Sequence, residues 1–163
     1  MKPRHLMYAF LGLAGCSSSR AVADEAAAPT RADKVVHTDA EWRKLLSPLA
    51  YDVMRHQGTE RPFSAGNFSD DHRHAVYHCA ACNLVLFRSE DKFDSGTGWP
   101  SFTRPATPDA VAIAGDNSLG IERMEVHCPR CGGHLGHVFD DGPKPTGKRY
   151  CIDGVALKQE LVK

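Results

Sequence analysis

The sequence lacks an excess of charge of either sign. Its 20 lysine and arginine residues balance its 20 aspartate and glutamate residues, so the formal net charge at neutral pH is zero. Nucleic-acid-binding domains usually carry a basic excess or a basic face, and this chain has no long basic run. The composition therefore argues against a nucleic acid as a partner.

Long hydrophobic runs are also missing. The N-terminal apolar stretch covers only residues 6–14, whereas a membrane-spanning helix needs about 20 apolar residues. No internal repeat of solenoid length is visible. Hydrophobic residues make up 42% of the chain and charged residues 25%, which are ordinary values for a globular protein with a buried core. A length of 163 residues suits one domain rather than two.

The N-terminal segment has the features of an export signal. Basic residues precede the apolar stretch, which ends in Leu13-Ala14-Gly15-Cys16. This pattern resembles the signal of bacterial lipoproteins, in which a cysteine is acylated and becomes the first residue of the mature chain. The resemblance predicts removal of residues 1–15, a lipid on Cys16 and a flexible tether over residues 16–34. It implies a lipid-anchored protein of the bacterial cell envelope that faces the periplasm; the alternative is an ordinary signal with an incidental cysteine.

Two short helices are expected at the start of the globular domain, residues 35–163. Thr38-Asp-Ala-Glu41 has the spacing of a capping box, and Ser47-Pro48 pairs a capping hydroxyl with a proline at the first helical position. Gly58 is expected to end the second helix. The apolar residues of the first helix are expected on one face: Trp42, Leu45 and Leu46.

The rest of the chain has a sequence pattern typical of strands and turns. Between residues 60 and 160, short apolar runs alternate with glycine, proline, aspartate and asparagine, which predicts antiparallel sheet with loops. Asp153-Gly154 predicts a hairpin or a bulge between two of these strands.

Four cysteines have the spacing of a metal site. Cys79 and Cys82 form one C-x₂-C pair, Cys128 and Cys131 form another, and 45 residues separate the pairs. Two tight turns of this kind can supply the four thiolates that a tetrahedral Zn²⁺ binds. Two redox disulfides are the alternative, because an exported chain enters an oxidising compartment. A site made of Cys128, Cys131 and two histidines is a further alternative.

One cysteine remains when the lipidation and metal residues are set aside. Cys151 is therefore a candidate reactive thiol. Arg149 lies two residues away, on the same face of an extended strand, where its charge favours the thiolate. His134 and His137 would point to opposite faces of a straight strand, so their convergence requires a bend, which Gly136 permits.

At these residues the sequence resembles a known family, the methionine-R-sulfoxide reductases. The resemblance covers roughly residues 38–160. It is carried by both cysteine pairs and by Gly58-Thr-Glu-Arg-Pro-Phe63, Lys92-Phe-Asp-Ser-Gly-Thr-Gly-Trp-Pro-Ser-Phe102, His134-Leu-Gly-His-Val-Phe139 and Gly147-Lys-Arg-Tyr-Cys-Ile152. It implies a mainly β domain of two antiparallel sheets packed as a compact barrel-like unit, with short N-terminal helices and one structural zinc opposite the active site.

The resemblance also assigns roles to individual residues. Cys151 would be the nucleophile, with His134, His137 and Arg149 around the sulfoxide oxygen. The expected substrate-binding residues are Trp99, Phe139 and Asp153. The substrate would be methionine-R-sulfoxide, free or in oxidised proteins, and the reductant a thioredoxin-like protein or a small thiol. A monomer is expected.

The chemistry requires these residue types. Reduction of a sulfoxide needs a soft nucleophile that takes up the oxidising equivalent, which a thiolate does by becoming a sulfenic acid. The departing oxygen needs a proton, which an imidazolium can supply near neutral pH. The competing interpretation is a zinc-ribbon-like binding or assembly module in which Cys151 has no role.

Two positions depart from the usual family pattern. Thr97 stands where many members carry a second, resolving cysteine, so the usual internal disulfide cannot form. Asp153 stands where an asparagine usually follows the nucleophile, so an acceptor that is normally ionised replaces an amide.

Overall fold

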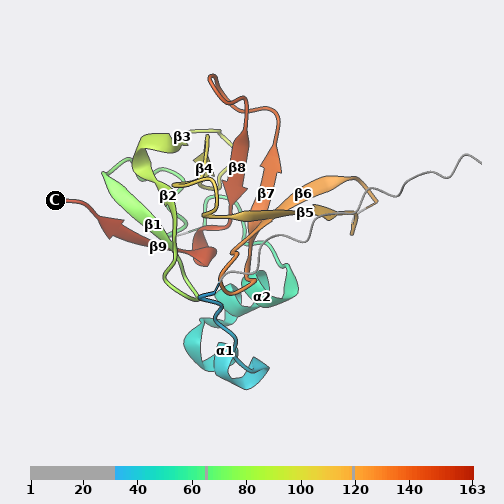
Figure 1. The fold of residues 1–163 in the computed structure, drawn as a ribbon. Coiled ribbons are helices and arrows are strands. Elements are labelled where there is room, and N and C mark those ends of the chain that lie inside the picture. The colour runs from blue at the N-terminus through green and yellow to red at the C-terminus, as the bar shows by residue number, and fades with distance from the viewer. Residues whose placement is uncertain (1–31, 65, 119) are drawn as a thin grey trace, which may run out of the picture.

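A computed structural model describes residues 32–64, 66–118 and 120–163 (Figure 1). The predicted signal, Cys16 and most of the predicted tether lie outside these residues. No described helix has the length and hydrophobicity needed to cross a membrane. The elements, in chain order, are α1 (Asp39–Leu45), α2 (Pro48–His56), β1 (Ala75–Cys79), β2 (Val85–Arg88), η1 (Ser89–Asp91), β3 (Lys92–Phe93), β4 (Ser101–Phe102), β5 (Ala112–Asp116), β6 (Arg123–His127), β7 (His134–Phe139), β8 (Arg149–Ile152), η2 (Gly154–Ala156) and β9 (Leu157–Leu161).

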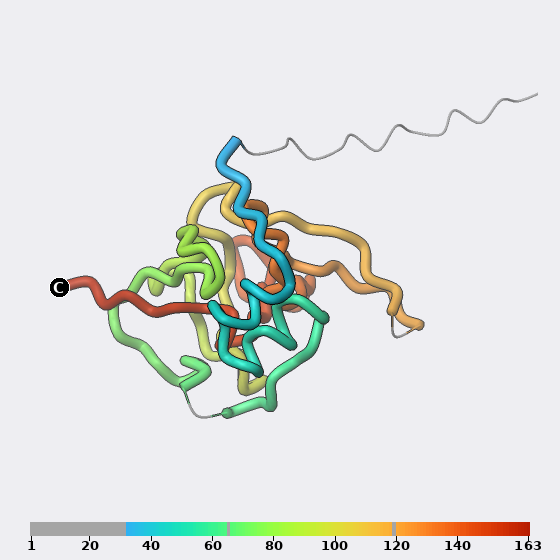
Figure 2. The backbone as a smooth tube through the Cα atoms, turned by 90° about the horizontal axis from the view of Figure 1, so that it is seen from below, coloured from blue at the N-terminus to red at the C-terminus, as the bar shows by residue number. Residues whose placement is uncertain are grey.

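The strands form two antiparallel sheets. One has three strands in the order β2-β1-β9, and the other has six in the order β3-β4-β8-β7-β6-β5. The β5–β6 hairpin projects from one side of the domain (Figures 1 and 2). Helices α1 and α2 lie below the sheets in the view of Figure 1. The prediction of a mainly β domain with two antiparallel sheets and short N-terminal helices is confirmed.

The two helices begin where their capping residues predict. Thr38 and Glu41 form a complete capping box, and the Ser47 hydroxyl accepts a hydrogen bond from the amide of Ala50. Trp42 and Leu46 are buried, but the expectation for Leu45 is wrong, because its side chain is 57% exposed. Trp42 and Leu46 are four residues apart and so lie on the same face of the helix, which packs against the core, whereas Leu45 lies beside that face.

The end of α2 also differs from the expectation. The left-handed residue is Gln57, with φ 57°, rather than Gly58. A side chain at position 58 would place its Cβ 2.4 Å from the Asp52 carboxylate. Glycine is therefore needed there for a close approach and not for a left-handed cap.

Aromatic rings from both sheets meet in the core. Phe87 of β2 and Phe102 of β4 stack with ring centroids 4.4 Å apart, and Tyr77 of β1 packs edge-on against Phe102 at 5.1 Å. All three side chains are fully buried. Because Phe102 belongs to the six-stranded sheet and the others to the three-stranded sheet, this cluster holds the two sheets together.

The prediction of a hairpin or a bulge at Asp153-Gly154 is wrong, because the strands on either side do not pair with each other. Strand β8 lies in the six-stranded sheet, and β9 pairs with β1 in the other sheet. The 3-10 turn η2 carries the chain from one sheet to the other. The Cβ of a side chain at position 154 would lie 2.3 Å from the carbonyl oxygen of Asn67. Glycine therefore lets the segment between the two sheets pack closely against the loop that contains Asn67.

Strand β7 contains the bend that the sequence requires. His127 of β6 pairs with His134 and Val126 pairs with Gly136, so Leu135 is an extra residue in β7. Gly136 has φ 147°, and a Cβ at this position would lie 2.1 Å from the carbonyl oxygen of Cys151. The bulge and the glycine together bring the backbones of β7 and β8 into close contact.

We expect Gly136→Ala to destabilise the domain by about 1–3 kcal/mol, because the added methyl meets backbone rather than a movable side chain. Urea unfolding monitored by tryptophan fluorescence measures this change. Gly115→Ala is the matched control, since Gly115 lies on an exposed strand with no atom within 4 Å of the new Cβ, and it should change stability by less than about 0.5 kcal/mol. Equal effects of the two substitutions would contradict the packing argument.

Candidate active site

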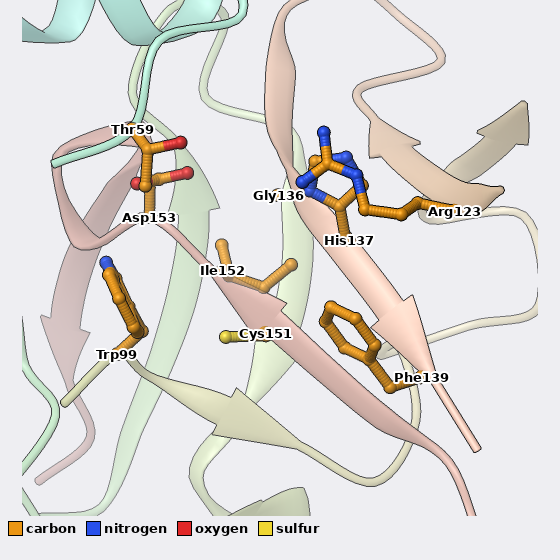
Figure 3. Close-up of a pocket in the computed structure, with 9 residues that line it drawn as sticks. All are labelled: Thr59, Trp99, Arg123, Gly136, His137, Phe139, Cys151, Ile152 and Asp153. Carbon is orange, nitrogen blue, oxygen red and sulfur yellow. The ribbon is translucent and has the colours of Figure 1, made fainter. Parts of the chain in front are cut away.

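A cavity of about 170 Å³ opens beside Cys151 (Figure 3). Its walls come from the segment after α2, the loop before β4, the start of β6, and strands β7 and β8. The lining residues are Thr59, Trp99, Arg123, Gly136, His137, Phe139, Cys151, Ile152 and Asp153.

Cys151 supplies the thiol in this cavity. Within the six-stranded sheet it pairs with Ser101 of β4 on one side and with His137 of β7 on the other. Its sulfur points toward the indole of Trp99 (Figure 3). Burial raises the pKa of the thiol, the charge of Arg149 and a hydrogen bond with Thr97 lower it, and the charge of Asp153 raises it. The net shift is upward, so the resting side chain is a thiol at neutral pH.

Arg149 acts on Cys151 from outside the cavity lining. Its guanidinium lies 4.4 Å from the centroid of the Phe139 ring and makes two hydrogen bonds of 2.8 Å to the Asp141 carboxylate. The hydrogen bonds to Asp141 are the main cause of the raised pKa of Arg149. The positive charge is thus fixed beside the thiol, as the two-residue spacing predicts.

His137 is the histidine that lines the cavity. Its Nε2 lies 2.7 Å from the Asp116 carboxylate, which also accepts a hydrogen bond of 2.6 Å from Arg123. Hydrogen bonds from Ser118 and from His137 hold the pKa of Asp116 well below its usual range. A carboxylate that is ionised at all ordinary pH values therefore fixes the orientation of the imidazole.

His134 lies outside the cavity lining, although its ring centroid is 5.3 Å from that of His137. Its side chain is 3% exposed, and Nδ1 lies 2.6 Å from the Glu125 carboxylate. Burial lowers the pKa of His134, while Glu125 opposes that shift. The bend in β7 brings the two histidines together as expected, but only His137 faces the site where a ligand would sit.

Trp99 and Asp153 share one wall with the segment after α2. The indole Nε1 donates a hydrogen bond of 3.2 Å to the carbonyl oxygen of Glu60, and the Glu60 amide donates one of 2.9 Å to Asp153. Burial raises the pKa of Asp153 to about 7, and the charge of Glu60 adds to the rise. Glu60 therefore connects the aromatic and the acidic side of the cavity.

The four predicted metal ligands lie together at the turns after β1 and after β6. The sulfurs of Cys79 and Cys131 are 3.7 Å apart, those of Cys82 and Cys128 are 3.6 Å apart, and all four lie within 4.8 Å of one another. Four sulfurs about 2.3 Å from a tetrahedral zinc ion would be about 3.8 Å apart, so the donor set fits zinc. All five described cysteines are free, so neither pair forms the alternative disulfide.

Several contributors to the site were given no role from the sequence, although Thr59 and Glu60 lie in the motif at residues 58–63 that carries the family resemblance. Thr59 and Arg123 line the cavity, Glu60 supports two of its residues, and Asp116 and Glu125 bind the two histidines. Their roles depend on the pairing of β5, β6 and β7 and on the path of the chain after α2. A single sequence does not encode that register in any local pattern.

Comparison with known proteins places the chain in a family. The SelR domain model matches residues 46–161. The peptide methionine sulfoxide reductase MsrB of Bradyrhizobium diazoefficiens is 54% identical over 136 residues, which are 83% of this chain and 97% of the relative. The MsrB of Herminiimonas arsenicoxydans is 52% identical over 126 residues (77% and 91%), and that of Methanosarcina mazei is 51% identical over 125 residues (77% and 89%). The chain therefore belongs to the SelR family of MsrB-type peptide methionine sulfoxide reductases.

Proposed function

We propose that the chain reduces the R epimer of methionine sulfoxide, free or in oxidised proteins, through a sulfenic acid on Cys151. The observation that carries this proposal is the thiol that faces a cavity walled by the Trp99 indole and holding the His137 imidazole. Membership of the SelR family supports the choice of substrate. The domain is expected to act as a monomer.

The cavity suits a methionine sulfoxide side chain. Its aromatic walls, Trp99 and Phe139, offer apolar contact for the methyl group, and each methyl-sized group is worth about 1 kcal/mol of discrimination. The polar groups Thr59, His137 and Asp153 offer hydrogen bonds for the sulfoxide oxygen. The methyl group and the oxygen of a bound sulfoxide would thus meet different walls of the cavity.

The reaction consumes one proton for each thiolate that reacts. The Cys151 sulfur attacks the sulfoxide, the bond between sulfur and oxygen breaks, and the oxygen ends on Cys151 as a sulfenic acid. Thiolate, sulfoxide and one proton together give sulfenic acid and sulfide, so the cysteine loses two electrons and the methionine sulfur gains them. His137 and Asp153 are the two cavity side chains that could carry this proton.

Turnover then needs a thiol from outside the chain. The other described cysteines are the four of the metal cluster, and Thr97 occupies the position next to Cys151. Two external thiols return the sulfenic acid to the thiol, with release of water and formation of a disulfide in the reductant. A thioredoxin-like protein or a small thiol would serve.

Cys151→Ser is expected to abolish reduction of methionine-R-sulfoxide, because the substituted side chain cannot take up oxygen in this way. The assay measures thiol-dependent consumption of each diastereomer separately, and the unfolding temperature should stay near that of the wild type. Residual activity above about a tenth of the wild-type rate would contradict the nucleophile assignment. A binding module with an incidental cysteine would show no sulfoxide consumption in either protein.

We further propose that the four-cysteine cluster holds one structural zinc ion. Zinc there would join the turn between β1 and β2 to the turn between β6 and β7. Cys79, Cys82, Cys128 and Cys131 would be its ligands, and none of them lines the cavity. The ion's part would be to add metal-binding energy to the stability of the fold.

Cys82→Ser is expected to lower the zinc content below one ion per chain and to destabilise the domain strongly, because a structural zinc contributes its binding energy to folding. Elemental analysis and thermal unfolding measure the two effects. Cys151→Ser is the control and should keep both the zinc and the unfolding temperature. A wild-type chain that contains no zinc would contradict the assignment.

We also propose that residues 1–15 direct export and that Cys16 is lipidated, which would anchor the enzyme in the bacterial cell envelope. The support is the sequence pattern at residues 13–16. Repair of oxidised envelope proteins would then be its role.

Cys16→Ala is expected to abolish lipidation, because the acylated thiol is lost. Expression in a bacterial host with labelled fatty acid, followed by detergent partitioning, measures the anchor. The wild type should take up label and enter the detergent phase, whereas the variant should do neither. Equal membrane association of both proteins would refute the lipid anchor.

A further inference from the structure

One carboxylate connects three strands behind the wall of the cavity. Asp116, the last residue of β5, pairs with Arg123 at the start of β6, and its Oδ2 atom accepts a hydrogen bond of 2.6 Å from that guanidinium. The same oxygen lies 2.7 Å from Nε2 of His137 on β7. The other oxygen, Oδ1, accepts a hydrogen bond of 2.9 Å from the Ser118 amide. Arg123 and His137 line the cavity (Figure 3) and Asp116 does not, so Asp116 acts on the site only through these neighbours.

The hydrogen bonds of Asp116 identify which nitrogen of His137 bears a hydrogen. The Asp116 side chain is 12% exposed, and its bonds to Ser118, His137 and Arg123 keep it ionised. An ionised carboxylate only accepts hydrogen bonds, so Nε2 must donate in the neutral ring as well as in the imidazolium. The lone pair of the neutral ring therefore lies on Nδ1, which has no hydrogen-bond partner among the described residues.

His137 is placed to exchange a proton inside the cavity. It pairs with Cys151 across β7 and β8, so the two side chains project from the same face of the sheet, and both line the cavity. The Asp153 carboxyl is turned toward Thr59 in Figure 3, and its Oδ1 atom accepts the hydrogen bond of the Glu60 amide. The imidazole is therefore the side chain that the strand pairing directs to the thiol.

We propose that Asp116 is a positioning residue for the reduction: it holds His137 in the Nε2–H form, so that Nδ1 takes the proton of the Cys151 thiol and passes it to the sulfoxide oxygen. This inference rests on the proposed function. The thiolate attacks the sulfoxide, the bond between sulfur and oxygen breaks, and the oxygen ends on Cys151 as a sulfenic acid. The cysteine loses two electrons, the methionine sulfur gains them, and the imidazole ends neutral as it began.

The carboxylate serves a proton carrier in two ways. Its hydrogen bond fixes the orientation of the ring, and its negative charge stabilises the imidazolium that exists between the two proton transfers. Arg123 and the Ser118 amide in turn hold the carboxylate in place. The other charged or titratable groups around the imidazole are Glu125 on β6, which binds His134, and Cys151 on β8. The projecting β5–β6 hairpin thus contributes to the site through Asp116.

Nitrogen-15 NMR of the His137 ring tests the tautomer directly. At a pH where the ring is neutral, Nε2 of the wild type should carry the hydrogen and Nδ1 should not; the signals are identified by their loss in His137→Gln. Asp116→Asn replaces one oxygen by an NH₂ group that accepts no hydrogen bond, so the preference for Nε2–H should be lost. A wild-type ring with its hydrogen on Nδ1 would overturn the proposal, and that result depends neither on substrate nor on the folding of a variant.

Single-turnover kinetics test the reaction step. Enzyme without reductant is mixed with excess methionine-R-sulfoxide, and the formation of one equivalent of methionine is followed. At saturating substrate, Asp116→Asn should slow this step about 100-fold, because proton transfer is impaired. The substrate concentration that gives half the maximal rate should change little, since Asp116 does not line the cavity.

Asp71→Asn is the matched control. Asp71 is 14% exposed and, like Asp116, accepts hydrogen bonds from an arginine side chain, at 2.6 Å, and from a backbone amide, at 3.0 Å. It lies outside the cavity lining and has no histidine partner among the described residues. Its single-turnover rate and its His137 nitrogen signals should equal those of the wild type.

A double variant separates positioning of His137 from a general structural role. Asp116→Asn should slow the His137→Gln enzyme by less than about 3-fold, because the residue through which Asp116 acts is already absent. An equal loss of rate in both backgrounds would overturn the proposal. A wild type that reduces no sulfoxide would overturn the proposed function, whereas a wild type that reduces it with His137 in the Nδ1–H form would overturn this inference alone.

Discussion

The candidate active site depends on the close approach of two backbones at Gly136. The absence of a side chain there lets β7 lie against the carbonyl of Cys151, and the bulge at Leu135 turns the strand so that His137 pairs with Cys151. Any side chain at position 136 would separate the strand that carries the imidazole from the strand that carries the thiol. Close packing of the main chain therefore sets the relative positions of the Cys151 thiol and the His137 imidazole.

The crossing from β8 to β9 gives this site its buried acid. Because the chain leaves the six-stranded sheet directly after Ile152, Asp153 faces inward at the junction of the two sheets rather than at a solvent-exposed hairpin tip. The same crossing places Gly154 against Asn67 and within hydrogen-bonding reach of Glu60. Topology therefore accounts for the burial of both carboxyls, and burial accounts for their raised pKa values.

The sequence predicts features that are encoded locally or by strong spacing. The caps at Thr38 and Ser47, the mainly β character and the clustering of the four paired cysteines all follow from short motifs. Three features could not be read in this way: the partner sheet of β9, the exposure of Leu45, and the contact between Asp116 and His137. Each is decided by which segments meet in three dimensions, and turn residues such as Asp153-Gly154 are compatible with a hairpin and with a crossing alike.

The surroundings of Cys151 shift the pKa of its thiol in opposite directions. Burial and the charge of Asp153 favour the neutral thiol, whereas Arg149 and the Thr97 hydrogen bond favour the thiolate. A site dominated by Arg149 would hold a thiolate at all times, open to oxidants other than the substrate. Here the net shift of the Cys151 pKa is upward, so the sulfur becomes nucleophilic only when its proton is removed. The neutral resting thiol therefore limits oxidation of Cys151, and it does so by keeping the thiolate a minor form.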